Sequence, residues 1–344
     1  MDNRGAFTRT EIFSQPEAWR AALDVLTAQQ HDITRLWQRG QYDHILFTGC
    51  GSTYFVALAA AAVLQELSGR TVRALPASEL WLSPASSYAR AGKTLLVAVS
   101  RSGSTTETVR ACEAFKHDGR GDLVTLSCYP DQPLVQLGAL NIVLTAGQED
   151  SVVQTRAFST LYLSVVALAA LWTDHGILFD ELSGLPAAGR QVLSSAAVLA
   201  QSIGTDMTFD RFYFLGSSLR YGLACEYALK MKEMSLTHSE PFHFMEFRHG
   251  PMSMVTKSAV LVGLVSQTNC LNELKVLAEM RDCGARIVSV GESDVEVEFR
   301  SGLSEAAQSV LYLPFAQLIG YERSMAKGLN PDQPHNLTAV VRLV

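Results

Sequence analysis

The chain has 344 residues, of which 48% are hydrophobic and 18% are charged, and its formal net charge is −6. This length is typical of about two domains, and the acidic balance argues against a broad surface for nucleic acid or anionic membranes. The six cysteines form no C-x-x-C pair and no metal spacing, as expected of reduced thiols in a cytoplasmic protein. No apolar signal segment opens the sequence, and its most apolar helical stretch, residues 161–172, is too short to span a membrane.

Strands, glycine turns and helices follow one another in the same order in both halves of the sequence. After a weak helical lead-in, residues 42–51 read as an apolar strand that ends in a glycine turn, and an alanine-rich helix follows. Residues 211–217 repeat this pattern, with Gly216 aligned to Gly49. Strands that alternate with helices indicate parallel sheets with right-handed crossovers. The predicted fold class is therefore α/β, with two tandem doubly wound parallel-sheet domains.

The predicted division is a lead-in over residues 1–40, a first domain over 41–195, and a second domain with a C-terminal tail over 196–344. Ligands bind such sheets at the carboxyl ends of strands, near the switch in strand order. The GCGS turn at residues 49–52 lies at such an end, but it lacks the third glycine of a dinucleotide fingerprint. A nicotinamide enzyme is therefore disfavoured, and no cofactor is predicted.

A cluster of hydroxyl side chains gives the strongest functional signal. Residues 95–100 read as a buried strand, LLVAVS, and residues 101–107, RSGSTTE, lead into a helix. Backbone N–H groups, hydroxyls and the partial positive charge of a helix N-terminus favour a phosphate there. The alternative is an ordinary helix N-cap, where serine and threonine are common. The corresponding turn of the second half, residues 266–273, has lost the glycine and the hydroxyl density, so it is not expected to hold phosphate.

A charged stripe is predicted on the helix that follows Gly222. Glu226, Lys230 and Glu233 fall on one face because they are spaced by single helical turns. The ordinary explanation is a solvated salt-bridge stripe. The alternative is that one carboxylate transfers protons, with its pKa raised by burial.

One histidine stands on a predicted loop. His249 precedes Gly250 and Pro251, which form a turn signal. A single loop histidine is usually a polar surface residue. The histidines of this region lack the spacing of a zinc site, so no metal is predicted.

Together these segments resemble the tandem sugar-isomerase (SIS) domain family, and in particular the isomerase half of glutamine–fructose-6-phosphate aminotransferases. The resemblance covers residues 42–344. It is carried by CGST at Cys50–Thr53, SRSGST at Ser100–Thr105, ALKMKE at Ala228–Glu233, FRHGP at Phe247–Pro251 and NPDQPHNL at Asn330–Leu337.

The resemblance implies that four side chains hold a sugar phosphate: Ser52, Ser100, Ser102 and Thr105. It also implies that Glu233 moves a proton between C1 and C2 of the sugar, and that Lys230 lies near the sugar. Glu226 would be a second glutamate of the same helix at the site. His249 would take part in ring opening and would reach the site from the neighbouring subunit of a homodimer.

Three departures from the family pattern affect these expectations. The chain is too short for the glutaminase domain, so glutamine-dependent synthesis is not expected from it. Ala339 stands where the synthases have a lysine, which puts the ammonia step in doubt. Arg101 replaces a frequent glutamine, and it could either add charge to the phosphate site or point outward.

The sequence therefore predicts an aldose–ketose isomerase or a deaminase that acts on a hexose or hexosamine 6-phosphate without a metal. The alternative is a sensor that binds a sugar phosphate without catalysis. The presence of both Glu233 and His249 favours the enzyme, whereas the missing lysine at position 339 favours the sensor.

Overall fold

The computed structural model describes residues 3–343, which form two compact units with one parallel sheet each. The first-sheet unit comprises Glu17–Glu149, Arg156–Ser183 and the residues from Thr338 onward. The second-sheet unit comprises Gly184–Leu337, Asp150–Thr155 and the N-terminal residues up to Pro16. The chain passes between the units several times, whereas the predicted domains are continuous segments with boundaries at residues 40 and 195. That division remains a prediction.

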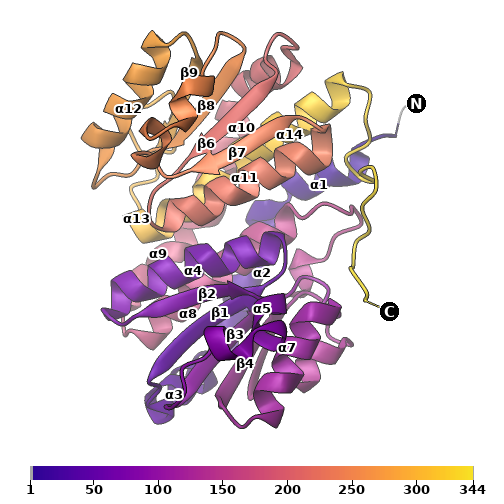
Figure 1. Cartoon of the computed structure of the whole chain (residues 1–344), viewed down its shortest axis with the longest axis vertical. Helices are drawn as coiled ribbons and strands as arrows, with labels where there is room; N and C mark the ends of the chain where they lie inside the picture. The colour runs from indigo at the N-terminus through magenta and orange to yellow at the C-terminus, as the bar shows by residue number, and fades with distance from the viewer. Residues whose placement is uncertain (1–2, 344) are drawn as a thin grey trace. The chain divides into compact units, whose positions relative to one another are not determined.

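The sheet of the first-sheet unit has five parallel strands in the order β2-β1-β3-β4-β5. Strands β1 to β4 of this sheet are labelled in Figure 1. Its central strand β3 (Thr94–Val99) is buried along its whole length, as expected of an apolar run in a covered parallel sheet. The strand order reverses between β1 (His44–Gly49) and β3, and Thr48 of β1 pairs with Ala98 of β3. The turns that follow these two strands therefore leave the same edge of the sheet.

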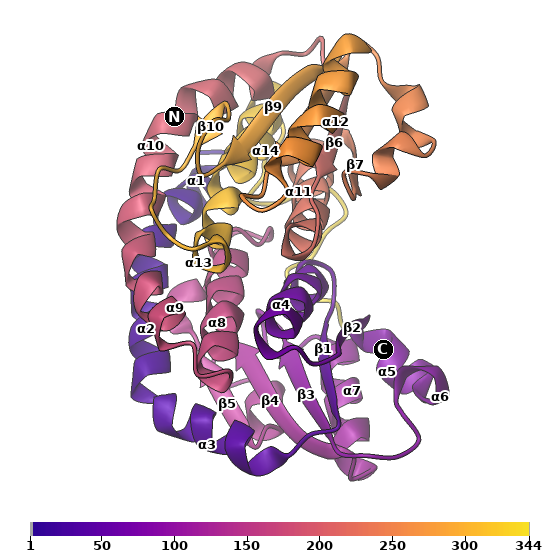
Figure 2. The same cartoon turned by 90° about the vertical axis from the view of Figure 1, so that its left-hand side faces the viewer.

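Helices cover both faces of this sheet (Figure 2). The other elements of the unit are α2 (Gln15–Ala28), α3 (Gln30–Gly40), α4 (Ser52–Ser68), β2 (Val72–Pro76), α5 (Ala77–Leu82), α6 (Pro84–Ser87), α7 (Thr106–His117), β4 (Gly121–Ser127), β5 (Leu140–Val143), α8 (Arg156–Trp172) and α9 (Gly176–Glu181). Helices α5 and α7 pack on one face through a cluster that includes Leu96 and Phe115. Helices α4 and α8 pack together on the other, and α8 is buried from Ala157 to Trp172. No helix within residues 3–343 is long and apolar enough to cross a membrane.

The sheet of the second-sheet unit also has five parallel strands, in the order β10-β9-β8-β6-β7. Its elements are α1 (Ala6–Phe13), α10 (Leu185–Thr205), β6 (Arg211–Leu215), α11 (Leu219–Ser235), β7 (His238–Phe242), β8 (Ala259–Leu264), α12 (Cys270–Asp282), β9 (Arg286–Gly291), β10 (Val297–Glu298), α13 (Glu305–Gln308) and α14 (Leu313–Ala326). Here the order reverses between β6 and β8. The predicted pair of doubly wound parallel sheets is confirmed.

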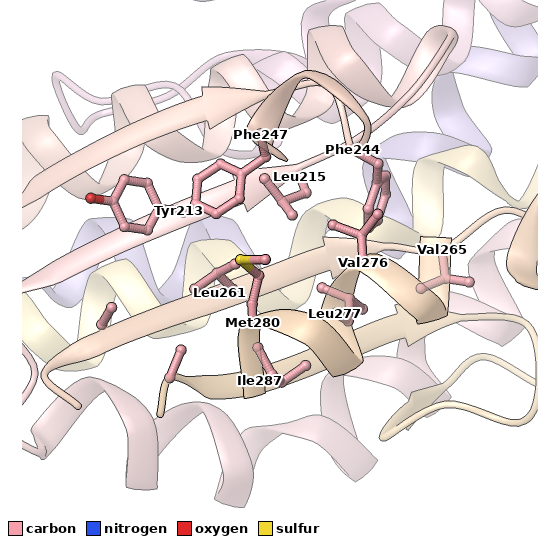
Figure 3. Close-up of a cluster of buried hydrophobic side chains, with 12 residues drawn as sticks. Tyr213, Leu215, Phe244, Phe247, Leu261, Val265, Val276, Leu277, Met280 and Ile287 are labelled. Carbon is pink, nitrogen blue, oxygen red and sulfur yellow. The ribbon is translucent and has the colours of Figure 1, made fainter. Parts of the chain in front are cut away.

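One hydrophobic cluster of this unit fixes the loop that follows β7 (Figure 3). Tyr213 of β6 and Met280 of α12 belong to it, and so do Phe244 and Phe247 from the loop. The rings of Tyr213 and Phe247 have centroids 5.1 Å apart and are tilted by 60°. Phe247 is fully buried, so the segment just before His249 is anchored to the sheet.

The turns after β1 and β6 confirm the internal repeat in their backbone conformation. A Cβ on Gly49 would lie 2.6 Å from the carbonyl of Thr53, and Gly216 meets the backbone of the following helix in the same way. Two residues later Gly51 has φ 55° and ψ −125°, and Ser218 has φ 53° and ψ −131°. The second half therefore keeps a conformation that favours glycine although the side chain has changed.

The NPDQP motif holds the N-terminal helix of the second-sheet unit. Asp332 is 5% exposed, and its carboxylate accepts hydrogen bonds from the backbone N–H and the hydroxyl of Thr8, at 2.8 and 2.7 Å. The side-chain oxygen of Asn330 accepts from the N–H of Gly5 at 3.0 Å. These bonds satisfy N–H groups at the start of α1 that have no partner within the helix. The motif is therefore explained by local structure.

Candidate functional site

Three of the predicted phosphate-binding hydroxyls converge at the carboxyl end of β3. The hydroxyl of Ser102 lies 3.3 Å from that of Thr105, and the hydroxyl of Ser100 donates to Thr105 at 3.5 Å. The N–H of Gly103 donates to the Ser100 hydroxyl at 3.2 Å, and Gly103 has φ +66°. Thr105 is the N-cap of α7, but its side chain makes no capping hydrogen bond. The first turn of α7 therefore retains the positive end of the helix dipole next to three hydroxyls, as an anion site requires.

Ser52 lies at the same edge of the sheet, in the turn after the neighbouring strand β1. It is the first residue of α4 and is 4% exposed. The adjacent Thr53 hydroxyl accepts from the N–H of Cys50 at 3.0 Å, so this turn is closed by its own side chains. Burial raises the pKa of the Cys50 thiol, which argues against a nucleophilic role. Within residues 3–343, no hydrogen bond joins Ser52 to the hydroxyls of the β3 turn.

Arg101 points inward. Its side chain is 6% exposed and forms an ion pair of 3.1 Å with Glu149, whose side chain is fully buried. A second guanidinium nitrogen donates to the backbone carbonyl of Ala339 at 3.1 Å. The other oxygen of Glu149 accepts from the N–H of Ala157, in the first turn of α8, at 3.0 Å. Of the two orientations left open by the sequence, the outward one is wrong.

A pocket of about 190 Å³ opens beside the hydroxyl turn, all within the first-sheet unit. It is lined by Arg101, Ser102, Ser104, Tyr129, Gln132, Glu149, Ala339, Val340 and Arg342. The hydroxyl of Tyr129 donates to the carbonyl of Glu149 at 3.2 Å and fixes that wall. The pocket therefore combines turn hydroxyls, two guanidinium groups and one carboxylate.

In the second-sheet unit the equivalent turn is filled by a side chain of the protein itself. Glu273 accepts hydrogen bonds from the N–H and the hydroxyl of Ser266, at 2.6 and 2.9 Å, and is 2% exposed. Helix α12 begins at Cys270, only four residues after Ser266, whereas α7 begins six residues after Ser100. The longer helix and its carboxylate leave this turn without a free donor for phosphate at Ser266.

The α11 stripe is buried rather than solvated. The ammonium of Lys230 lies 3.4 Å from a carboxylate oxygen of Glu226 and also forms an ion pair with Glu233. The side chains of Lys230 and Glu226 are 2% and 1% exposed, whereas that of Glu233 is 20% exposed. Glu233 is thus the member of the trio that solvent or a ligand can reach.

His249 lies on an exposed loop, as predicted. Its backbone N–H donates to the carbonyl of Glu246 at 3.0 Å. Within residues 3–343 its side chain makes no hydrogen bond or ion pair, so neither joins it to the α11 trio. Among the same residues, no group of three His, Cys, Asp or Glu side chains is arranged to hold a metal ion.

Sequence reasoning missed Glu149 and Tyr129, which fix Arg101 and the pocket wall. Glu149 follows the strand β5 by six residues in a loop, where no periodicity marks a buried carboxylate. The unusual Arg101 was the available signal, because a buried guanidinium needs a partner.

The comparisons with known proteins identify the class of this fold. Residues 41–172 match the SIS domain, the family that the motifs of the sequence resemble.

Particular relatives extend the similarity over nearly the whole chain. A glutamine–fructose-6-phosphate aminotransferase (isomerizing) of Sulfolobus acidocaldarius is 29% identical over 97% of this chain and 56% of the relative. The chain therefore spans little more than half of the length of such relatives. The crystal structure of a glucosamine-6-phosphate deaminase from Thermotoga maritima is 25% identical, with a TM-score of 0.80 over 98% of this chain and 99% of that one. A tagatose-6-phosphate ketose/aldose isomerase from Escherichia coli shares the fold, with 24% identity and a TM-score of 0.86 over 96% of this chain and 95% of that one.

Proposed function

We propose that the chain is a phosphosugar isomerase or deaminase that acts on a hexose or hexosamine 6-phosphate. The observation that carries this proposal is the convergence of three hydroxyls at the N-terminus of α7, beside a pocket with two arginines. The similarity to isomerases and to a deaminase of sugar phosphates supports the same substrate class. Arg101 contributes to the substrate site by fixing one wall of this pocket.

Proton transfer is assigned to Glu233. In an aldose–ketose isomerisation, its carboxylate takes the proton from C2 and returns it to C1, while the C1 oxygen gains a proton and the C2 hydroxyl loses one to become the ketone. With a 2-amino sugar the same transfer yields an imine at C2, and water then replaces the nitrogen, which leaves as ammonia. A carboxylate base and a donor to the carbonyl oxygen suffice for this sequence of steps.

Lys230 and Glu226 have different tasks in this proposal. The ammonium of Lys230 holds Glu233 in position and keeps a positive charge beside the developing enediolate. Glu226 is almost fully buried on the other side of Lys230, so it acts through Lys230 as a positioning residue.

His249 is proposed to assist ring opening in a homodimer, reaching the site of the neighbouring subunit. The exposed position of its loop supports this role. Met245 and Met254 flank it and are 39% and 54% exposed, an apolar surface that a second copy of the chain could cover. A cytoplasmic location also remains a proposal.

The test combines turnover and binding in matched variants. We expect the purified protein to release ammonia from glucosamine 6-phosphate, or to interconvert hexose 6-phosphates, and to exchange a carbon-bound proton with deuterated water. The Glu233→Gln variant should lose turnover at least about a hundredfold, the usual contribution of a general base, and should keep its substrate affinity. Glu66→Gln, on the exposed surface of α4, is the control for loss of one carboxylate.

Tight binding of sugar phosphates without turnover or proton exchange would instead identify the sensor. In that case the Glu233→Gln substitution should change nothing measurable.

A further inference from the structure

The C-terminal segment that begins at Thr338 is attached to the first turn of α7. The carbonyl of Val341 accepts from the N–H of Thr106 at 3.4 Å, and the N–H of Leu343 donates to the hydroxyl of Thr106 at 3.1 Å. These two bonds lie on either side of Arg342. The yellow segment from Thr338 to Leu343 accordingly runs down to α7 in Figure 1. The backbone of Arg342 is thus held at the N-terminus of the helix that carries the phosphate-binding turn.

Arg342 is an exposed cation at the pocket beside the N-terminus of α7. It lines the pocket with Ser102 and Ser104, and within residues 3–343 its guanidinium has no hydrogen-bond or ion-pair partner. A cation is repelled by the partial positive charge of a helix N-terminus. Glu149 is the carboxylate among the residues that line this pocket, and Arg101 already pairs with it. The pocket therefore holds one positive charge in excess, together with the helix dipole.

We propose that Arg342 binds the phosphate group of the substrate, from the C-terminal segment and opposite the hydroxyl turn. This inference rests on the proposed function and adds a residue to its site. A phosphate monoester carries up to two negative charges near neutral pH, and its planar oxygen pairs suit the two-pronged guanidinium. Binding of the phosphate removes the charge excess and strengthens the attachment of the segment to α7. The neighbouring Ala339 has no charge to offer, so the cation of this segment comes from Arg342.

The binding test uses the intact protein and three probes: inorganic phosphate, glucosamine 6-phosphate and unphosphorylated glucosamine. We expect Arg342→Ala to weaken the affinity for the two phosphate-containing probes about tenfold, the usual scale for one charge-assisted hydrogen bond. Arg342→Lys should recover part of this loss, because lysine restores the positive charge but not the paired N–H donors of the guanidinium. The control Arg90→Ala removes an exposed arginine that precedes β3 at the opposite end of the strand, and its affinities should equal those of the unsubstituted protein.

Protection of the segment gives a second, independent measurement. Phosphate should slow carboxypeptidase digestion of the C-terminal segment in the unsubstituted protein and in Arg90→Ala, but not in Arg342→Ala. Unchanged phosphate affinity in Arg342→Ala would overturn the inference.

The failure of this inference can be told apart from failure of the proposed function. If Ser102→Ala loses phosphate affinity and Arg342→Ala keeps it, the turn binds phosphate and Arg342 does not. If the unsubstituted protein binds neither phosphate nor glucosamine 6-phosphate, both proposals are wrong.

Discussion

The buried carboxylate of Glu273 gives a sharp test of why the second turn differs from the first. Truncation by Glu273→Ala removes the acceptor of two hydrogen bonds to Ser266 and leaves a buried N–H without a partner. Each hydrogen bond to a charged group contributes roughly 1.5–3 kcal/mol, and an unsatisfied buried donor costs about 1–3 kcal/mol. The substitution also has an opposing effect, because it removes the desolvation cost of a buried carboxylate. The second oxygen of Glu273 has no hydrogen-bond partner within residues 3–343 to offset that cost.

The two hydrogen bonds should outweigh the relief of this desolvation cost, because both are short, at 2.6 and 2.9 Å. We expect Glu273→Ala to lower the free energy of unfolding by about 2 kcal/mol. Glu273→Gln keeps an acceptor oxygen and removes the charge, so it should lose less. Urea unfolding followed by circular dichroism measures these differences.

A second glutamate of α12 provides the control. Glu279 accepts from Arg248 at 2.7 Å, and the side chains of this pair are 36% and 30% exposed. Exposed pairs contribute up to about 1 kcal/mol, so Glu279→Ala should lose less than Glu273→Ala. A loss at Glu273 no larger than at Glu279 would refute the argument that the carboxylate stabilises the turn. A gain in stability would show that burial of the charge dominates.

Three further predictions concern the neighbouring elements. Phe247→Ala should lower the free energy of unfolding by about 3–5 kcal/mol, because removal of a buried ring leaves a cavity, and Phe247→Leu should lower it by less than half of that. Urea unfolding measures both values, and equal losses would contradict the anchoring role. Partial desolvation of the ring, which stacks on Tyr221, lowers the pKa of His243 in the folded protein, so the unfolded chain takes up its proton first as the pH falls. The melting temperature should therefore drop below pH 6.5, the ordinary pKa of histidine, and less steeply in His243→Gln; parallel profiles would refute this. Gly49→Ala should unfold at lower temperature and lose phosphate affinity in calorimetry, because its Cβ would meet the backbone of Thr53, and unchanged values would exclude the clash.

The sequence was sufficient to predict the sheets because both halves repeat a strong local signal. Apolar runs such as residues 94–99 are buried on both faces, and the glycines of the two turns are required by close backbone contacts. The edge strands β2, β5, β7 and β10 were not predicted. They are short and partly exposed, so their residues carry little periodicity.

The candidate site was predictable only where its residues are adjacent in the sequence. The hydroxyls at Ser100, Ser102 and Thr105 come from one turn, so a local motif revealed them. The partners of Arg101 come from distant segments, and single-sequence reasoning has no access to such pairings. The hydrogen bonds from Ser266 to Glu273 could likewise not be predicted from the sequence. The sequence does show that this turn has lost the hydroxyl side chains of the first.

Ser218 is a position at which a substitution should stabilise this protein. Its φ of 53° with ψ of −131° is sterically unfavourable for any residue with a Cβ, and strain of this kind amounts to roughly 1–3 kcal/mol. The side chain is exposed. Ser218 belongs neither to the proposed phosphate-binding residues nor to the proposed catalytic residues. A glycine there would release the strain at the price of a more flexible unfolded chain. Such a variant offers protein engineers a more robust scaffold in which damaging substitutions at the catalytic positions can be studied without loss of the folded state.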